Sequence, residues 1–554
     1  MTDGVPPLEG AQDRIRDAFL AHDRGLFVLD CTAGFGKSTT VERVAAEALV
    51  EAAACEPAPE RGLCVVSFSR EDAAGIVPGI TAALAAFADV EQATATTISP
   101  ERSQRLRERV RHADHVGTID SIFRTVFTEI HAEYGFDQMP TVGNDAHLTS
   151  LREAALDALR DRESLTARFE RLDEAYGDET ASDGRGADGR TLDTLLEAAR
   201  SAKRARRLSD EQFRERLLGA IDEAFPDGRP ATFEAVVRDV ARFFDEETAA
   251  AFRQRHDDEA AVTAQSRTCF DRWRARVEEF CSLVAAYETE YDRRCRERGV
   301  LAHQDVAYWV ADFFEDAGDA DDPFRERVRQ RHAHAFQTLI IDEAQDVSVA
   351  QHDALAPLVP DDARVLLAGD TDQCIYAWRD ARPELFTRAF EAGEYFGRSW
   401  TPHERADAAR TYRMRPDISA AVDAVFETVF TDPARGGLHR TGDDYTLVET
   451  DREATGEPAV HVASYRARGS PGTTTWFEES EAAPLSNYLH GALADDGFAS
   501  RDADGPVEVL FPTRTNMESL AARLEATGLS VADASELLFE SPLVELVVGV
   551  VEWL

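Results

Sequence analysis

The sequence predicts an α/β fold built on a parallel sheet with helices on both faces. Residues 26–29, 337–341 and 364–368 are short apolar runs of the kind that form buried strands. Each run ends in a glycine-rich or acidic segment. Because ligands of open α/β sheets bind at the carboxyl ends of the strands, we expect the functional residues on the loops that follow these three runs.

The loop after the first run has the composition of a phosphate-binding loop. Residues 31–39 read Cys-Thr-Ala-Gly-Phe-Gly-Lys-Ser-Thr, and the helix-forming residues 41–46 follow. Backbone N–H groups at a helix N-terminus cradle phosphate oxygens, and a serine hydroxyl at this position can reach Mg²⁺. The candidate nucleotide-binding residues are Thr32, Ala33, Gly34, Phe35, Gly36, Lys37, Ser38 and Thr39. The alternative is a glycine turn that only joins strand to helix.

Lys37 is one of only two lysines among the 61 basic residues of the chain. A compact ammonium group fits between phosphates where a planar guanidinium group would not. The retention of lysine at this position therefore favours the nucleotide-binding interpretation.

The loops after the other two runs carry acidic, amide and aromatic side chains. Asp342 is expected to bind Mg²⁺ through water, and Glu343 to polarise the water that attacks a γ-phosphate. Gln373 can sense that phosphate, while Tyr376 and Trp378 offer flat faces to stacked bases. The alternatives are a solvated acidic turn for the carboxylates and core packing for the aromatic rings.

The overall charge is strongly negative. The chain has 104 Asp and Glu residues against 61 Lys and Arg residues, a formal net charge of −43. Apolar residues remain plentiful enough for packed cores, so the composition indicates adaptation to molar salt rather than disorder. Seven cysteines without C-x-x-C spacing predict neither a zinc site nor an iron–sulfur cluster. No bilayer-length apolar run or signal peptide is recognised, so a cytoplasmic location without membrane contact is expected.

The ordered segments resemble the superfamily 1 helicases of the UvrD/Rep type. The resemblance covers most of the chain, and it rests on Gln12 and on residues 31–39, 65–70, 117–121, 299–305, 342–346, 369–379 and 411–416. Departures from the family pattern are Cys31, Phe35, Asp120 and Met414. Residues 412–416 are also similar to a second branch of superfamily 1, which would reverse the direction of travel and admit RNA. Residues 372–379 favour the UvrD type.

The resemblance implies ATP and Mg²⁺ as cofactors and a role for each matched residue. Gln12 would read the adenine, Tyr412 would pack on it, and Lys37 and Ser38 would bind the phosphates and Mg²⁺. Arg413 would act on the γ-phosphate as an arginine finger does. Asp342 and Glu343 would carry hydrolysis, and Gln373 would couple nucleotide state to DNA. The DNA-binding residues would be Phe68, Thr118, Ser121, Tyr376 and Trp378.

The same motifs divide the chain into expected domains. Residues 1–133 and 300–400 would form one RecA-like domain, interrupted by a helical insertion at 134–299, and residues 401–554 would form part of a second RecA-like domain. Within the insertion, residues 151–172 and 268–298 are expected to be long helices and 177–190 a loop. Residues 460–463 and 507–511 are expected to be strands, 469–483 a surface loop, and 516–527 a helix.

Two arginine-rich segments are candidates for DNA contact in this acidic chain. Residues 101–112 carry a local net charge of +3, and the second segment contains Arg200, Lys203, Arg204, Arg206 and Arg207. The second is favoured because the insertion lines part of the DNA path in the resembled family. We expect Arg204, Arg206 and Arg207 to contact phosphates. The alternative is a solvated helix face.

The resemblance implies an ATP-dependent helicase or translocase that moves 3′ to 5′ on single-stranded DNA in repair or recombination. The family's motifs V and VI are not recognised before Leu554. The alternative is therefore a nucleotide-gated DNA-binding subunit with weak ATPase activity, which needs a second polypeptide to supply those motifs. A small-molecule kinase with a phosphate-binding loop is a third class, which the ordered motifs disfavour.

Overall fold

The computed structural model describes most of the first 431 residues and shorter stretches beyond them. The described residues are 7–89, 96–143, 145–176, 191–315, 322–375, 380–431, 448–450, 452–453, 460, 483–493, 509, 514–526 and 531. The chain divides into two compact units, Met1–Thr455 and Gly456–Leu554, and each is considered by itself. No helix among the described residues is long and apolar enough to cross a membrane.

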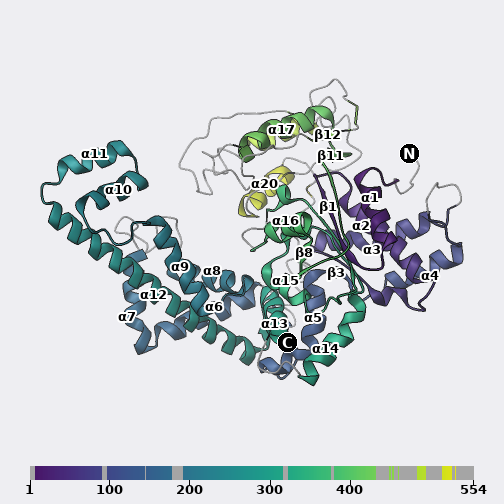
Figure 1. The fold of residues 1–554 in the computed structure, drawn as a ribbon, viewed down its shortest axis with the longest axis horizontal. Coiled ribbons are helices and arrows are strands. Elements are labelled where there is room, and N and C mark those ends of the chain that lie inside the picture. The colour runs from purple at the N-terminus through teal and green to yellow at the C-terminus, as the bar shows by residue number, and fades with distance from the viewer. Residues whose placement is uncertain are drawn as a thin grey trace. The chain divides into compact units, whose positions relative to one another are not determined.

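A six-stranded sheet forms the centre of the first unit (Figure 1). The strand order is β10 (His403–Ala408), β1 (Gly25–Cys31), β7 (Arg364–Gly369), β6 (Thr338–Ile341), β2 (Leu63–Ser67) and β3 (Val116–Thr118). Every pair of neighbouring strands is parallel. The predicted α/β fold class, a RecA-like parallel sheet with helices on both faces, is confirmed.

The four central strands β1, β7, β6 and β2 are buried on both faces, which explains why they are continuous apolar runs. Leu26 and Val28 of β1 join a core with helices α5 (Ile119–Ile130), α13 (His303–Glu315) and α15 (Val349–Leu355). The alternate residues Phe27 and Leu29 join a second core with α1 (Ala11–Ala21), α2 (Lys37–Ala52), α3 (Arg70–Ala86) and α4 (Pro100–Val110). The alternation of side chains along a strand therefore assigns successive residues of β1 to opposite layers.

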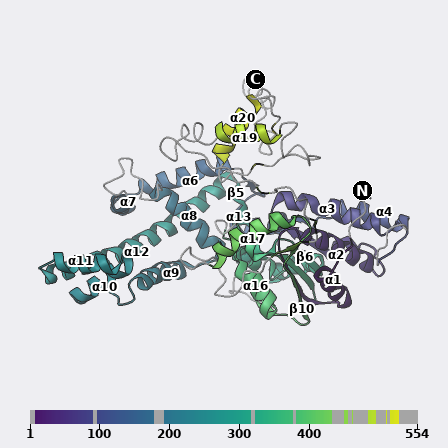
Figure 2. The ribbon, with the colours of Figure 1, turned by 90° about the horizontal axis from the view of Figure 1, so that it is seen from above.

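The helical insertion leaves and rejoins the sheet domain through a short parallel pair, β4 (Thr141–Val142) with β5 (Val300–Leu301). Its helices are α6 (Asp145–Arg160), α7 (Glu163–Tyr176), α8 (Leu192–Ala205), α9 (Asp210–Ala224), α10 (Phe233–Phe243), α11 (Glu246–Arg255) and α12 (Glu259–Arg298). In Figure 2, α10 and α11 lie at one end of α12, away from β5.

The insertion differs from expectation in two helix boundaries. The single helix expected at 151–172 is two helices, α6 and α7, because the chain turns at residues 161–162. The helix expected from residue 268 begins earlier, at Glu259, where the Asp258 carboxylate caps it by accepting from the Ala261 N–H. The loop expected at 177–190 lies outside the described residues.

The sheet extends past the expected domain boundary at 400/401. Residues 403–408 form β10, which pairs with β1 in parallel from Leu26↔His403 to Cys31↔Ala408. The boundary is therefore misplaced for this strand. The cause is tertiary, since an edge strand with polar residues resembles a connection when the sequence is read alone.

The remaining elements of the first unit are short or peripheral. They are α14 (Pro323–Ala333), α16 (Pro383–Ala392), the antiparallel pair β8 (Glu394–Tyr395) and β9 (Arg398–Ser399), the parallel pair β11 (Arg410–Thr411) and β12 (Glu449–Thr450), and α17 (Pro416–Thr431). Single 3₁₀ turns are η1 (Pro59–Gly62), η2 (His131–Tyr134), η3 (His334–Phe336), η4 (Ala344–Asp346) and η5 (Thr371–Gln373).

The second unit is described over two helices, α19 (Ala483–Leu493) and α20 (Arg514–Ala526). Leu520 and Leu524 of α20 are buried against Leu485 and Leu489 of α19. Helix α20 coincides with the helix expected at 516–527. The strands expected at 460–463 and 507–511 lie outside the described residues apart from Val460 and Val509, and so does the loop expected at 469–483 apart from residue 483.

Candidate nucleotide-binding site

Six of the predicted motifs follow the six strands of the sheet. In sheet order, they are residues 411–415 after β10, the phosphate loop after β1, 369–373 after β7, 342–346 after β6, Phe68 after β2 and residues 118–121 at the end of β3. Since all six strands are parallel, these segments meet at one edge, where ligands of such sheets bind. Motifs separated by hundreds of residues in the chain are therefore neighbours in space.

The phosphate loop needs glycine at two positions for reasons of geometry. Gly34 and Gly36 both have left-handed backbone conformations, with φ of 76° and 91°. A Cβ atom on Gly34 would lie 2.6 Å from Thr411 Oγ1, and one on Gly36 would lie 2.8 Å from Gln12 Nε2. Glycine therefore lets two other segments, at residues 12 and 411, approach the loop closely.

Gln12 is buried against the phosphate loop. Its side-chain Nε2 donates to the carbonyl oxygens of Phe35 at 3.0 Å and Gly36 at 3.2 Å. Its Oε1 accepts from the backbone N–H of Glu9 at 3.1 Å. Gln12 thus holds the loop in this conformation, and its predicted contact with adenine stays a prediction.

Lys37 begins helix α2 and is only 7% exposed. Its ammonium donates to the Cys31 carbonyl oxygen at 3.4 Å and lies 4.0 Å from Oδ2 of the Asp370 carboxylate. Gln373 Nε2 donates to the same oxygen, Asp370 Oδ2, at 2.5 Å. Burial raises the pKa of Asp370, while the charge of Lys37 opposes that shift. One carboxylate therefore links the lysine of the phosphate loop to the glutamine after β7.

Asp342 follows β6 and is 2% exposed. Burial, with the charge of Glu343, raises the pKa of Asp342 to about 7, and a hydrogen bond with the Ser38 side chain opposes the shift. The two residues predicted to bind magnesium are thus in direct contact. Mg²⁺ is commonly held by one or two protein oxygens together with waters and substrate phosphates, so this pair fits such an ion. Among the described residues, no cluster of three or more His, Cys, Asp or Glu side chains could hold a metal.

Glu343 has a left-handed backbone with φ of 53°, which is uncommon for a residue other than glycine. Its Oε2 accepts from Gln345 Nε2 at 2.8 Å, and Gln345 Oε1 accepts from the Asp370 N–H at 3.0 Å. Gln345 is not among the predicted site residues. Its position two residues after Glu343 was visible, but its contact with the loop after β7 depends on the pairing of β6 with β7.

The segment after β11 docks on the phosphate loop. The Tyr412 N–H donates to the Gly34 carbonyl oxygen at 2.8 Å, and the Tyr412 ring stacks on Phe35 with centroids 5.6 Å apart. Arg413 is exposed beside it, and its N–H donates to Thr411 Oγ1 at 3.2 Å. The structure therefore brings both residues to the phosphate loop, while their roles toward ATP stay predictions.

Comparison with protein families shows which family the chain belongs to. The model of the UvrD/REP helicase N-terminal domain matches residues 12–392, which contain the phosphate loop and the residues after β6 and β7. The chain belongs to the UvrD/REP helicase family.

Among curated relatives, an ATP-dependent helicase/nuclease subunit from Clostridioides difficile is 24% identical over 157 residues, 28% of this chain and 12% of that protein. The protein of the same name from Pelotomaculum thermopropionicum is 25% identical over 276 residues, 48% of this chain and 20% of that protein. The matched regions thus span a fifth or less of the length of these relatives.

Three residues that the resemblance assigns to DNA lie beside the site of this UvrD/REP family member. Phe68 directly follows β2 and is half-buried. Thr118 caps helix α5, since its Oγ1 accepts from the Ser121 N–H at 3.2 Å, and Ser121 Oγ donates to the Thr118 carbonyl at 2.6 Å. Tyr376 and Trp378 lie outside the described residues.

Arg204, Arg206 and Arg207, which are predicted to contact phosphates, are each paired with a carboxylate in the structure. Arg204 is 3% exposed and is paired with Glu288 at 2.6 Å and Asp305 at 3.0 Å. Arg206 is paired with Asp380 at 3.0 Å, and Arg207 with Asp353 at 3.2 Å. The acids come from other helices and loops, so spacing along the chain did not reveal them.

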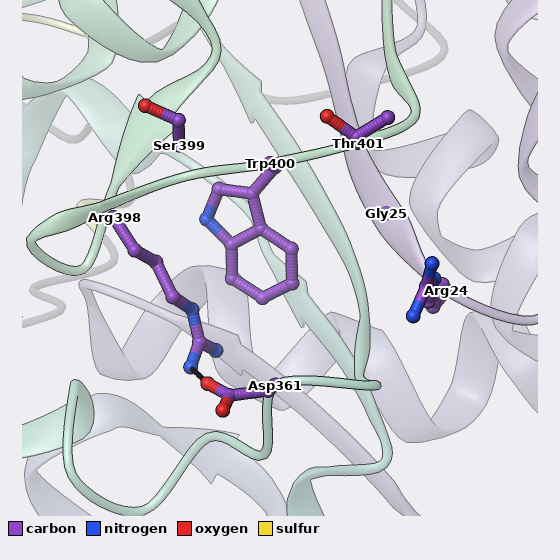
Figure 3. A pocket seen from close by; sticks show the side chains of 7 residues that line it. All are labelled: Arg24, Gly25, Asp361, Arg398, Ser399, Trp400 and Thr401. Carbon is purple, nitrogen blue, oxygen red and sulfur yellow. Dashed lines mark hydrogen bonds and ion pairs between the residues drawn. The ribbon is translucent and has the colours of Figure 1, made fainter.

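A separate cavity of about 250 Å³ lies at the amino end of β1, whereas the phosphate loop follows its carboxyl end. Figure 3 shows the Arg398 guanidinium beside Trp400 and directed at Asp361. Arg398 also donates to the carbonyl oxygens of Val359 at 3.0 Å and Pro360 at 2.8 Å. The Arg398 guanidinium is thus already bonded within the protein. Because the cavity lies at the opposite end of β1 from the phosphate loop, it is not part of the nucleotide-binding site.

Proposed function

We propose that this chain is the motor of an ATP-dependent DNA helicase or translocase that moves 3′ to 5′ on single-stranded DNA in repair or recombination. The observation that supports it most is the contact between Lys37 and Asp370, which is shared with Gln373. It joins the phosphate loop to the loop after β7, where the resemblance places the coupling of nucleotide to DNA.

The proposed chemistry assigns each step to a side chain. Lys37 and the N–H groups at the start of α2 bind phosphate oxygens, and Arg413 stabilises charge on the γ-phosphate. Ser38 and Asp342 hold Mg²⁺, which neutralises charge on the phosphates when bound. Glu343 orients and deprotonates the attacking water, while Gln345 fixes its carboxylate.

DNA binding in this proposal relies on stacking more than on charge. Phe68, with Tyr376 and Trp378, would contact bases, and Thr118 and Ser121 would contact the backbone. Stacking suits a chain with a net charge of −43, and also molar salt, at which phosphate contacts lose much of their advantage. We therefore propose a protein that works at high salt.

The test is ATP hydrolysis with and without single-stranded DNA, at potassium chloride concentrations from about 0.1 M to above 1 M. We expect stimulation by DNA, and preferential unwinding of duplexes that carry a 3′ single-stranded tail. Glu343→Gln is the control for contaminating ATPase. Hydrolysis that is indifferent to DNA would contradict the proposal and favour an ATPase of another class.

A second candidate is a nucleotide-gated DNA-binding subunit that works with another polypeptide. The relatives named as helicase/nuclease subunits favour it, since that name describes one part of an assembly. This function predicts that the chain alone binds Mg-ATP and single-stranded DNA but hydrolyses slowly, and that the partner restores turnover. The same assay separates the two candidates.

A further inference from the structure

The cations at the basic end of helix α8 are paired with acidic side chains, and several of these acids belong to the sheet domain. Arg200 and Arg204 pair with Asp305 of α13 at 2.9 and 3.0 Å, and Arg207 pairs with Asp353 of α15. Lys203 pairs with Asp210 and Glu288 within the insertion. Each of the five cations predicted to form a positive segment therefore has a carboxylate partner, and three of the helices involved meet at one interface.

Arg206 reaches the segment that follows Gln373. Its Nε lies 3.0 Å from Asp380 Oδ1, and Asp380 is only 8% exposed. Asp380 has a left-handed backbone with φ of 61°, and the next residue, Ala381, forms a β-bridge with Ser348 at the start of α15. The Arg382 N–H donates to the Val347 carbonyl at 3.1 Å. The ion pair thus sits next to the two residues that attach this part of the chain to the start of α15.

Arg207 also connects the insertion to the sheet domain. It occupies the position after the helix cap, with φ of 51°, and the Leu208 N–H donates to the Lys203 carbonyl at 2.9 Å. This hydrogen bonding is a Schellman motif, in which the left-handed residue is usually glycine. An arginine in this left-handed conformation is strained relative to glycine. Its guanidinium contacts Asp353 of α15 and Glu315 of α13, two helices of the sheet domain.

We propose that Arg206 and Arg207 form a latch that fixes the helical insertion to α15 and to residues 380–382. They are positioning residues, which act through Asp380 and Asp353 and touch neither nucleotide nor DNA. The inference rests on the proposed function in one respect: the latch would transmit the position of the insertion to the residues that couple ATP hydrolysis to DNA.

The alternative for Arg206 is the phosphate contact predicted from the sequence, and Asp380→Asn separates the two. Asparagine matches aspartate in size and tolerates the left-handed backbone, so this change removes little but the charge. If Arg206 contacts DNA, the loss of Asp380 frees it and DNA binds more tightly, whereas Arg206→Gln binds more weakly. If the pair is a latch, both variants behave alike and the double variant is no worse than either.

The first measurement is hydrogen exchange of the intact protein without nucleotide or DNA. Asp380→Asn, Arg206→Gln and the double variant should each speed exchange of the Arg382 amide by about two- to fivefold, the scale of one partly exposed ion pair. Arg171→Gln is the matched control, because its partner Glu279 lies within the insertion. Unchanged exchange in both single variants would overturn the latch.

The second measurement is ATP hydrolysis with saturating single-stranded DNA. Asp380→Asn should keep the basal rate and the KM for ATP, and lose about half or more of the DNA-stimulated increase in kcat. Arg206→Lys, which keeps the charge, should retain most of the increase. Opposite effects of Asp380→Asn and Arg206→Gln on DNA affinity would refute the proposal. If the wild-type protein shows no stimulation by DNA, the proposed function fails, and hydrogen exchange alone decides on the latch.

Discussion

The ring of Tyr412 stacks on the ring of Phe35, with centroids 5.6 Å apart and planes inclined by 25°. Phe35 is a departure from the pattern of the resembled family, and it lies in the middle of the phosphate loop. Its partner comes from a segment nearly four hundred residues later that also bonds to Gly34. The stacking of Tyr412 thus explains why a phenylalanine stands at position 35.

We expect the two rings to act as a unit in nucleotide binding. Phe35→Ala and Tyr412→Ala should each weaken ATP binding, with a coupling energy of about 0.5–1.5 kcal/mol in a double-mutant cycle. Tyr412→Phe keeps the stack and serves as the control. Titration with a fluorescent ATP analogue measures the effect. Strictly additive losses would show that the stacking has no role in binding.

Lys37→Arg tests whether the phosphate loop needs an ammonium group. The side chain is buried between the Cys31 carbonyl and the Asp370 carboxylate, so the broader guanidinium has no room. ATP affinity should fall at least about tenfold, or about 1.4 kcal/mol. The other lysine, Lys203, is paired with Asp210 and Glu288. Lys203→Arg is therefore the control and should leave ATP affinity intact. Normal affinity in the Lys37 variant would refute the assignment of the loop.

Glu343→Gln should separate binding from hydrolysis. The amide can still accept from Gln345 but cannot take a proton from water, so turnover should fall by at least about 10²-fold. Equilibrium binding of Mg-ATP should persist. Single-turnover hydrolysis and nucleotide titration on the same preparation provide the comparison. A rate close to the wild-type value would exclude Glu343 as the base.

Arg204→Ala should destabilise the fold rather than weaken a contact with DNA. Burial tends to raise the pKa of Asp305, but the charges of Arg200 and Arg204 outweigh that effect and hold the pKa below its usual value. This carboxylate is therefore ionised although it is completely buried. Removing a partner from such a cluster costs about 3–5 kcal/mol. Urea denaturation at constant salt should show the loss, with little change in Arg171→Ala. A stable variant with weaker DNA binding would instead support a contact between Arg204 and a DNA phosphate.

Much of the site was predictable because its determinants are local. The apolar run at 26–29, two closely spaced glycines and Lys37 specify a strand, a turn and a helix start within about fifteen residues. The structure contains these elements as β1, the phosphate loop and α2. The same holds for Asp342 and Gln373, each of which lies just after a strand that the apolar pattern marks.

Contacts between segments were not predictable in this way. Residues 403–408 join the sheet by pairing with β1, and their sequence, His-Glu-Arg-Ala-Asp-Ala, has no apolar run that would indicate a strand. Gln345 bonds to the Asp370 backbone only because β6 and β7 are neighbours. Sheet order, which follows from packing of the whole domain, decided both.

By itself, the sequence determined the fold class, the order of the motifs and the position of the candidate phosphate loop, because strand periodicity and turn chemistry are encoded by adjacent residues. Tertiary structure decided the partners of the arginines at the end of α8. Their acidic partners, from Glu288 to Asp380, are distant along the chain and close in space. The strength of an ion pair depends on that distance and on burial, and neither quantity is present in a one-dimensional pattern of charges.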